Sequence, residues 1–183
     1  IAVTIALFIA TILAMPLIPR QFFPSSDRPE LLVDLSLPQN SSIYASESSV
    51  ERFDALLKDD PDVDRWSSYV GRGAIRFYLP LNVQLPNNFF SQAVIVAKDV
   101  AARDRLQKKL QDALAKDFPN AVARVYPLEL GPPVGWPIQY RVSGPDISQV
   151  REIALKLAST VSANPNVENV NFDWLEPARK LRI

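Results

Sequence analysis

The chain begins with a stretch that is apolar at nearly every position and carries no charged side chain. It runs from Ile1 to Pro19 and reads IAVTIALFIATILAMPLIP. An α-helix needs about 20 such residues to cross the hydrocarbon core of a bilayer. The pattern therefore predicts a transmembrane helix over residues 1–19, or the end of one. The first residue is Ile rather than Met, which indicates an excerpt of something longer.

A signal-peptide core and a buried helix are the alternatives for this stretch. A signal peptide usually has basic residues before its apolar core and a small-residue cleavage site after it. Nothing basic precedes this stretch, and MPLIPRQFFP is a poor cleavage site. Residues 20–30 follow as a proline-punctuated linker. In it, Phe22 and Phe23 are aromatic residues of the kind that favour a membrane–water interface.

A first strand–helix–strand pattern follows the linker. Residues 31–37, LLVDLSL, and residues 63–70 are typical of strands. Between them, Ser46 is placed to cap a helix that Asp60 and Pro61 end. The apolar positions three and four residues apart on this helix are Val50, Phe53 and Leu57.

A second pattern of the same kind completes residues 31–130. Gly71-Arg72-Gly73 predicts a turn, residues 75–79 a further strand that forms a hairpin, and residues 80–88 a loop. The segments that repeat the first pattern are a strand at 91–97, a helix at 100–118 and a strand at 121–130. Two such units in one sheet predict an α+β fold, a ferredoxin-like α/β sandwich with both helices on one face.

Residues 134–183 carry half of a second such sandwich. Residues 136–142 alternate as in a strand, and residues 167–174 predict another strand. Between them, Asp146 and Gln149 form a capping-box pattern before a helix with a core-facing apolar stripe. One strand–helix–strand unit leaves an open apolar face and unpaired strand edges. We therefore expect this half to need a partner segment from elsewhere.

The composition excludes several kinds of chemistry. The chain has 20 basic and 20 acidic residues, so no basic surplus indicates nucleic-acid binding. It has no Cys and no His, which excludes thiol nucleophiles, Ser-His triads and zinc sites built on those residues within this chain. No spacing of carboxylates indicates acid–base catalysis. We expect neither an enzyme nor a bound cofactor. The chain has a single Met, Met15, which lies in the apolar start.

The order of these segments resembles the second half of a resistance-nodulation-division efflux pump. The most specific pieces are the turn at 71–73 with the following Arg76 to Pro80, and the run from Gly131 to Asp146. The resemblance implies the end of a spanning helix, a first C-terminal porter subdomain over 31–130 and half of a second over 134–183. It also implies a homotrimer in the bacterial inner membrane, with residues after about 20 in the periplasm. Proton-driven export of hydrophobic compounds, a periplasmic adaptor protein and an outer-membrane channel are implied as well.

The resemblance also implies a substrate pocket and a switch loop. Amphiphilic substrates of many shapes require apolar area more than a fixed hydrogen-bond pattern. The implied lining residues are Phe77, Trp136, Ile138 and Tyr140. Packing in the sheet core is the alternative for each of these four residues.

The switch loop of the family lies before and within the glycine turn. Here the corresponding stretch is short, so the usual phenylalanine-rich trap is in doubt. Trp66 and Tyr69 are the aromatic residues that can replace it, although a cross-strand aromatic pair in a plain hairpin is the alternative. Arg72 can meet an anionic substrate or face water. The switch-loop residues implied by the resemblance are Ser67, Ser68, Gly71, Arg72 and Gly73.

A membrane-tethered interaction module, without any enzymatic activity, is the rival interpretation. Such a protein would use its open sheet edge to pair with another chain. Both interpretations predict a spanning start and exposed apolar surface. They differ in whether the aromatic residues form a cleft that admits small apolar molecules.

Overall fold

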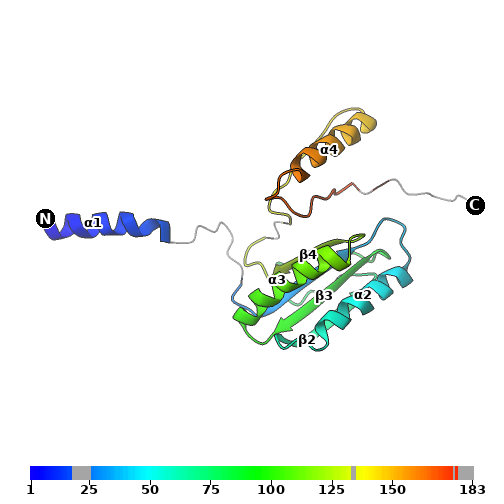
Figure 1. The fold of residues 1–183 in the computed structure, drawn as a ribbon, viewed down its shortest axis with the longest axis horizontal. Helices are drawn as coiled ribbons and strands as arrows, with labels where there is room; N and C mark the ends of the chain where they lie inside the picture. The colour runs from blue at the N-terminus through cyan, green and yellow to red at the C-terminus, as the bar shows by residue number, and fades with distance from the viewer. Residues whose placement is uncertain (18–25, 133–134, 175, 177–183) are drawn as a thin grey trace, which may run out of the picture.

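A computed structural model describes residues 1–17, 26–132, 135–174 and 176. Four strands form one sheet in the order β2-β3-β1-β4, and every pair of neighbours is antiparallel (Figure 1). The α+β class is confirmed. The strands are β1 (Glu30–Ser36), β2 (Val63–Val70), β3 (Phe90–Ala97) and β4 (Val122–Pro127).

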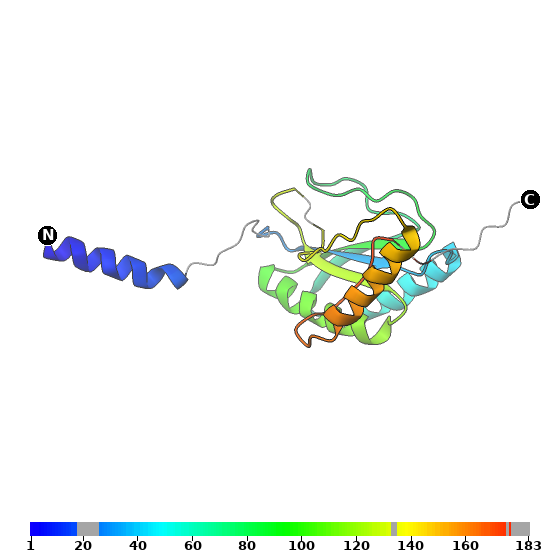
Figure 2. The same cartoon turned by 90° about the horizontal axis from the view of Figure 1, so that it is seen from above.

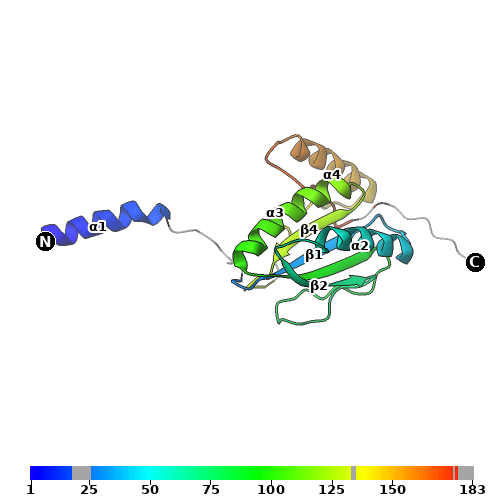
Figure 3. The ribbon, with the colours of Figure 1, turned by 60° about the horizontal axis from the view of Figure 1, so that its bottom comes forward.

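Two helices, α2 (Ile43–Leu57) and α3 (Val100–Asp117), lie side by side on one face of the sheet (Figure 3). Alternate strand residues point toward them, as period-two alternation requires. Phe53 of α2 and Leu106 of α3 are fully buried there against Ile95. Burial of this apolar face is the main stabilising contribution in the fold, because each large apolar side chain contributes about 1.5–3 kcal/mol.

Both helices begin at a residue whose side-chain oxygen accepts a backbone N–H. Ser42 caps α2 by accepting from Ala45, and Asp99 caps α3 by accepting from Ala102 at 2.7 Å. The prediction of Ser46 as the cap was wrong. Ser46 lies one turn inside α2, where it is buried and donates to the carbonyl oxygen of Asn88 at 2.6 Å.

The other face of the sheet is covered by the segment between β2 and β3, residues 71–89. Figure 2 shows this loop on the side away from α2 and α3. Leu81 from the loop packs on Leu32 and Leu128, with Tyr78 and Tyr126 beside them. The prediction of a strand at 75–79 was wrong, because Tyr78 and Leu81 reach back over the sheet instead of continuing the hairpin.

Of the strand, helix and strand predicted within residues 135–174, only the helix forms. Helix α4 (Ile147–Ser162) is capped by Asp146, whose carboxylate accepts from the backbone N–H of Gln149 at 3.0 Å, as the sequence predicts. The described residues at 136–142 and 167–174 form no strand, so both strand predictions were wrong. A helix satisfies its backbone internally, whereas a strand needs a neighbour. No side chain of α4 is buried, and Figure 3 shows α4 beyond α3, apart from the sheet.

The apolar start forms α1 (Ala2–Ala14), followed by a 3-10 turn, η1 (Met15–Leu17). Within the described ranges, no helix combines the length and apolarity that crossing a membrane requires. The predicted span over 1–19, or the end of one, extends beyond the described residues and stays a prediction. Phe22 and Phe23 lie outside the described residues.

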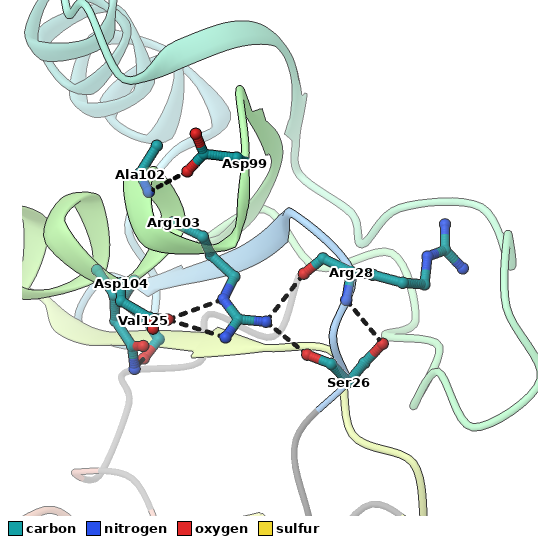
Figure 4. A network of polar contacts seen from close by, with 8 residues as sticks. Ser26, Arg28, Asp99, Ala102, Arg103, Asp104 and Val125 are labelled. Carbon is teal, nitrogen blue, oxygen red and sulfur yellow. Dashed lines mark hydrogen bonds and ion pairs between the residues drawn. The ribbon is translucent and has the colours of Figure 1, made fainter.

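The chain enters the sheet next to a buried arginine, Arg103 of α3 (Figure 4). Its guanidinium donates to the carbonyl oxygens of Ser26 and Arg28 and pairs with the Asp104 carboxylate at 2.8 Å. Ser26 also donates its N–H to the carbonyl oxygen of Leu128 at 2.9 Å. These bonds fix the segment that leads into β1 against the first turn of α3.

Candidate functional site

A row of polar side chains crosses the face of the sheet that the helices leave uncovered. Asp34 of β1 pairs in register with Gln92 of β3 on one side and with Arg124 of β4 on the other. Tyr126 follows on the same face of β4. The opposite positions of these strands belong to the apolar helix-side core. The strand period therefore brings these four side chains together.

Asp34 accepts two hydrogen bonds in this row. The Nε2 of Gln92 donates to Oδ1 at 2.6 Å, and the hydroxyl of Tyr126 donates to Oδ2 at 3.1 Å. Burial raises the pKa of Asp34 above its usual value of 3.8, while both hydrogen bonds and the charge of Arg124 act to lower it. Burial, and after it the charge of the Asp34 carboxylate, raises the pKa of the Tyr126 hydroxyl, so this group stays a donor.

Gln92 connects the row to the glycine turn. Its Oε1 accepts the buried N–H of Ala74 at 2.8 Å. A Cβ on Gly73 would lie 2.8 Å from the Cβ of Gln84 and 3.3 Å from that same Oε1. Glycine at 73 therefore lets the loop pass close over the amide of Gln92.

Arg124 connects the row to the segment after residue 134. Its guanidinium lies over the ring of Tyr126, 4.1 Å from the centroid, and 5.5 Å from the centroid of Trp136. It donates to the carbonyl oxygen of Gly135 at 2.5 Å and pairs with Glu129 at 3.4 Å. Gly135 has a φ of 70°, a conformation that glycine adopts without strain.

Trp136 lines a groove of about 490 Å³ that follows the free edge of β4 and the end of α3. The groove has an aromatic wall and a polar rim, so it can hold a mixed apolar and polar ligand. Its other side chains include Phe118, Arg124, Tyr126 and Gln111, with Glu168 and Asn169 from the far segment.

The structure does not bring the remaining predicted pocket residues to Trp136. Phe77 lies in the loop over the sheet, 38% exposed, with its ring centroid 5.4 Å from that of Tyr78. Ile138 and Tyr140 are 69% and 68% exposed, so they are not core residues. Whether these residues contact substrate stays a prediction.

The predicted switch-loop residues lie partly in a regular strand. Ser67, Ser68 and Tyr69 belong to β2, where they pair with residues of β3. Trp66 packs toward the helix-side core and donates its Nε1–H to Asp54 at 3.0 Å, and the hydroxyl of Ser68 donates to the same carboxylate. Trp66 is thus held against α2, and Tyr69 points to the opposite face, beside Gln92. Their role in a switch stays a prediction.

The glycine turn itself follows β2 directly. Gly71 is buried with a φ of 70°, and a Cβ there would lie 2.3 Å from Cδ1 of Ile43. Arg72 is exposed, in keeping with the solvated alternative. Glycine at 71 is therefore required by the turn itself, and a switching role for residues 71–73 stays a prediction.

Sequence reasoning missed Asp34, Gln92 and Tyr126. Each is a polar residue at an alternate position of a strand, which normally indicates a solvent-facing side chain. The signal that could have found them is the loop of residues 71–89, whose apolar Tyr78 and Leu81 need a face to cover. Across the described part of the chain, no three His, Cys, Asp or Glu side chains gather where they could hold a metal ion.

Comparisons with known proteins show which family the chain matches. A family model described as the AcrB/AcrD/AcrF family matches residues 1–183. Multidrug resistance protein MdtC of Klebsiella pneumoniae (strain 342) is 27% identical over 160 residues, which cover 85% of this chain and 15% of that protein. MdtC of Salmonella paratyphi C (strain RKS4594) is 26% identical over 187 residues, covering 100% of this chain and 17% of that protein. The chain thus spans about a sixth of the curated relatives it matches.

Two solved structures of a heavy metal efflux pump share the fold. Crystal form II has a TM-score of 0.63 at 13% identity and covers 99% of this chain and 19% of that one. Crystal form I has a TM-score of 0.60 at 18% identity and covers 99% and 20%. At such identities the likeness concerns the fold alone.

Proposed function

The chain belongs to the AcrB/AcrD/AcrF family, and we propose that it forms the periplasmic porter portion of a proton-driven resistance-nodulation-division efflux pump. The match of the family model across residues 1–183 is the observation that carries this proposal. The family consists of transporters rather than enzymes. In this proposal the pump is a trimer of the inner membrane that works with a periplasmic adaptor protein and an outer-membrane channel.

The proposal assigns residues 31–130 to one porter subdomain of the ferredoxin-like type. The order β2-β3-β1-β4, with α2 and α3 on one face, supports that name. Residues 134–183 are assigned to half of a second subdomain, since no side chain of α4 is fully buried. Residues 1–19 are assigned to the end of a spanning helix and residues 20–30 to the linker.

We assign hydrophobic or amphiphilic organic compounds as the substrates. Trp136, held beside Arg124 and Tyr126, provides the apolar area and polar rim that such molecules require. The two MdtC relatives are multidrug resistance proteins by name. The structural neighbours are described as heavy metal pumps, but this chain has one Met and no Cys or His, the soft and imidazole ligands that would carry such ions.

Export of a hydrophobic dye tests the assignment. Cells that depend on the pump containing this chain should accumulate several-fold more dye when Trp136→Ala or Phe77→Ala is introduced. Trp174→Ala is the matched control, because Trp174 is 59% exposed and lies outside the groove. Unchanged accumulation in both variants, at equal protein levels, would remove these residues from the substrate path.

A membrane-tethered interaction module is the second candidate. The exposed apolar residues of α4, Ile147, Ile153 and Leu155, are the observation that favours it. This candidate predicts capture of a partner chain by α4 and no dye export. A dye export defect in Trp136→Ala would decide against it.

A further inference from the structure

We propose that Asp34 is a positioning residue that holds two substrate-facing segments, the loop at Gly73–Ala74 and the segment at Gly135–Trp136, over one face of the sheet. The claim that the two segments face substrate rests on the proposed function. The positioning role of Asp34 rests on the contacts alone. Asp34 lies in β1, a central strand, and neither segment touches the other through any hydrogen bond described above.

The first arm runs from Asp34 through Gln92 to Ala74. An ionised carboxylate only accepts, so it turns the NH₂ group of Gln92 toward itself. The amide oxygen then faces the N–H of Ala74, which is buried and has this oxygen as its acceptor at 2.8 Å. The carboxylate therefore fixes the direction of the amide, and the amide fixes the start of the loop that carries Phe77.

The second arm runs from Asp34 through Tyr126 to Arg124. The hydroxyl of Tyr126 is fixed by Oδ2 of Asp34, and the ring below it supports the guanidinium of Arg124 at 4.1 Å. That guanidinium donates to the carbonyl oxygen of Gly135 and lies over Trp136. The two oxygens of the Asp34 carboxylate thus accept one hydrogen bond from each arm.

The amino-acid requirement at position 34 follows from these contacts. An Asn side chain replaces one carboxylate oxygen with an NH₂ group, so Gln92 and Tyr126 no longer each have an acceptor oxygen of their own. A Leu side chain of similar size accepts from neither. Leaving such partly buried donors unpaired is unfavourable, so loss of the carboxylate should loosen both segments.

Local readouts in the full chain test the two arms separately. Asp34→Leu should weaken both arms, Gln92→Leu only the loop arm, and Tyr126→Phe only the Trp136 arm. Hydrogen exchange at the Ala74 amide should accelerate at least tenfold in the first two variants. The fluorine resonance of 5-fluorotryptophan at Trp136 should shift in Asp34→Leu and Tyr126→Phe. Asp64→Asn is the control, because Asp64 lies on the edge strand β2 and forms an ion pair with the exposed Arg65, away from both arms.

Two results would overturn the inference. One is unchanged exchange at Ala74 together with an unchanged Trp136 resonance in Asp34→Leu. Another is an equal response of both readouts in Gln92→Leu and Tyr126→Phe, because that pattern indicates general loosening rather than two arms. If Asp34→Leu does not fold, the two single-arm variants decide between these outcomes.

Dye export in the pump containing the chain tests the substrate role. Gln92→Leu and Tyr126→Phe should raise the dye concentration for half-maximal export at least threefold and leave the maximal rate unchanged. Suppose the exchange and fluorine readouts respond but the dye concentration for half-maximal export does not rise. This result would overturn the substrate role of Asp34, whereas dye export by the wild-type pump would still uphold the proposed function. A wild-type pump that exports no dye contradicts the proposed function, and the exchange and fluorine results then decide the positioning alone.

Discussion

Residues 30–128 and residues 135–174 carry the same kind of sequence pattern and reach different structures. In the first region four of the five predicted strands form, all except 75–79, and two helices bury Phe53 and Leu106 against the sheet. In the second region the helix forms alone, and its apolar residues Ile153 and Leu155 are half exposed. The comparison teaches that an alternating pattern predicts strand preference, whereas strand formation requires a partner for its hydrogen bonds.

Core truncation should separate the two regions most strongly. Phe53→Ala should lower the free energy of unfolding by about 4 kcal/mol, because it leaves a large cavity under the sheet. Ile153→Ala in α4 is the matched control and should change it by less than about 0.5 kcal/mol. Urea denaturation of the full chain, followed by Trp66 fluorescence, measures both. Equal effects would show that α4 is packed as tightly as α2.

Arg103→Met should have the second largest effect. The change leaves the carbonyl oxygens of Ser26 and Arg28 without their donor, which costs about 3 kcal/mol in all. Arg105→Met is the control, because the Arg105 side chain is 62% exposed and pairs with Asp62 at the surface. The same denaturation experiment applies. A loss below that of Arg105→Met would contradict the anchoring of the chain entry by Arg103.

Helix caps sharpen the comparison at a smaller scale. Asp99→Ala removes the cap of α3 and should lower the stability of the whole sheet region by about 1 kcal/mol. Asp146→Ala removes the equivalent cap of α4 and should reduce helical circular dichroism without moving the denaturation midpoint. A common shift of the midpoint in both variants would indicate that α4 folds together with the sheet.

The smallest expected effect is a change in the pH dependence of stability that comes from Asp34. Its raised pKa means that the folded state holds the proton more tightly than the unfolded state. Asp34 therefore favours folding below its usual value near 3.8, and this contribution is lost as pH rises through its folded pKa. Asp34→Asn should flatten the decline in stability above about pH 4. Arg124, Tyr126 and Tyr78, which face the site, are the same in the variant and the wild type. A parallel pH profile in the variant would contradict the raised pKa.

Much of the sheet region could be predicted from the sequence, for reasons specific to each segment. The strand at 63–70 was predicted with its observed ends, since the proline before it and the glycine after it bound an alternating run. The cap of α4 was also predicted, because Asp146 and Gln149 act locally. The wrong prediction of a strand at 75–79 could not be avoided from these residues alone, because the packing of Tyr78 over Leu32 is a long-range contact.

The candidate site was predicted only in part. Trp136 was singled out and does line a groove, but the strand expected to align it with Ile138 and Tyr140 has no partner. Asp34 lies within the predicted strand 31–37 and was not singled out. Its importance depends on Gln92, 58 residues away, and on Tyr126, 92 residues away. Such separations are set by sheet order, which a single strand pattern does not contain.

Hydrogen exchange across the full chain tests most directly whether strand partners separate the two regions. We expect slow exchange at paired amides of β1 and β3, intermediate exchange within α4, and exchange near the unstructured rate at residues 136–142 and 167–174. Slow exchange at those last two segments, equal to that of β1, would contradict the account.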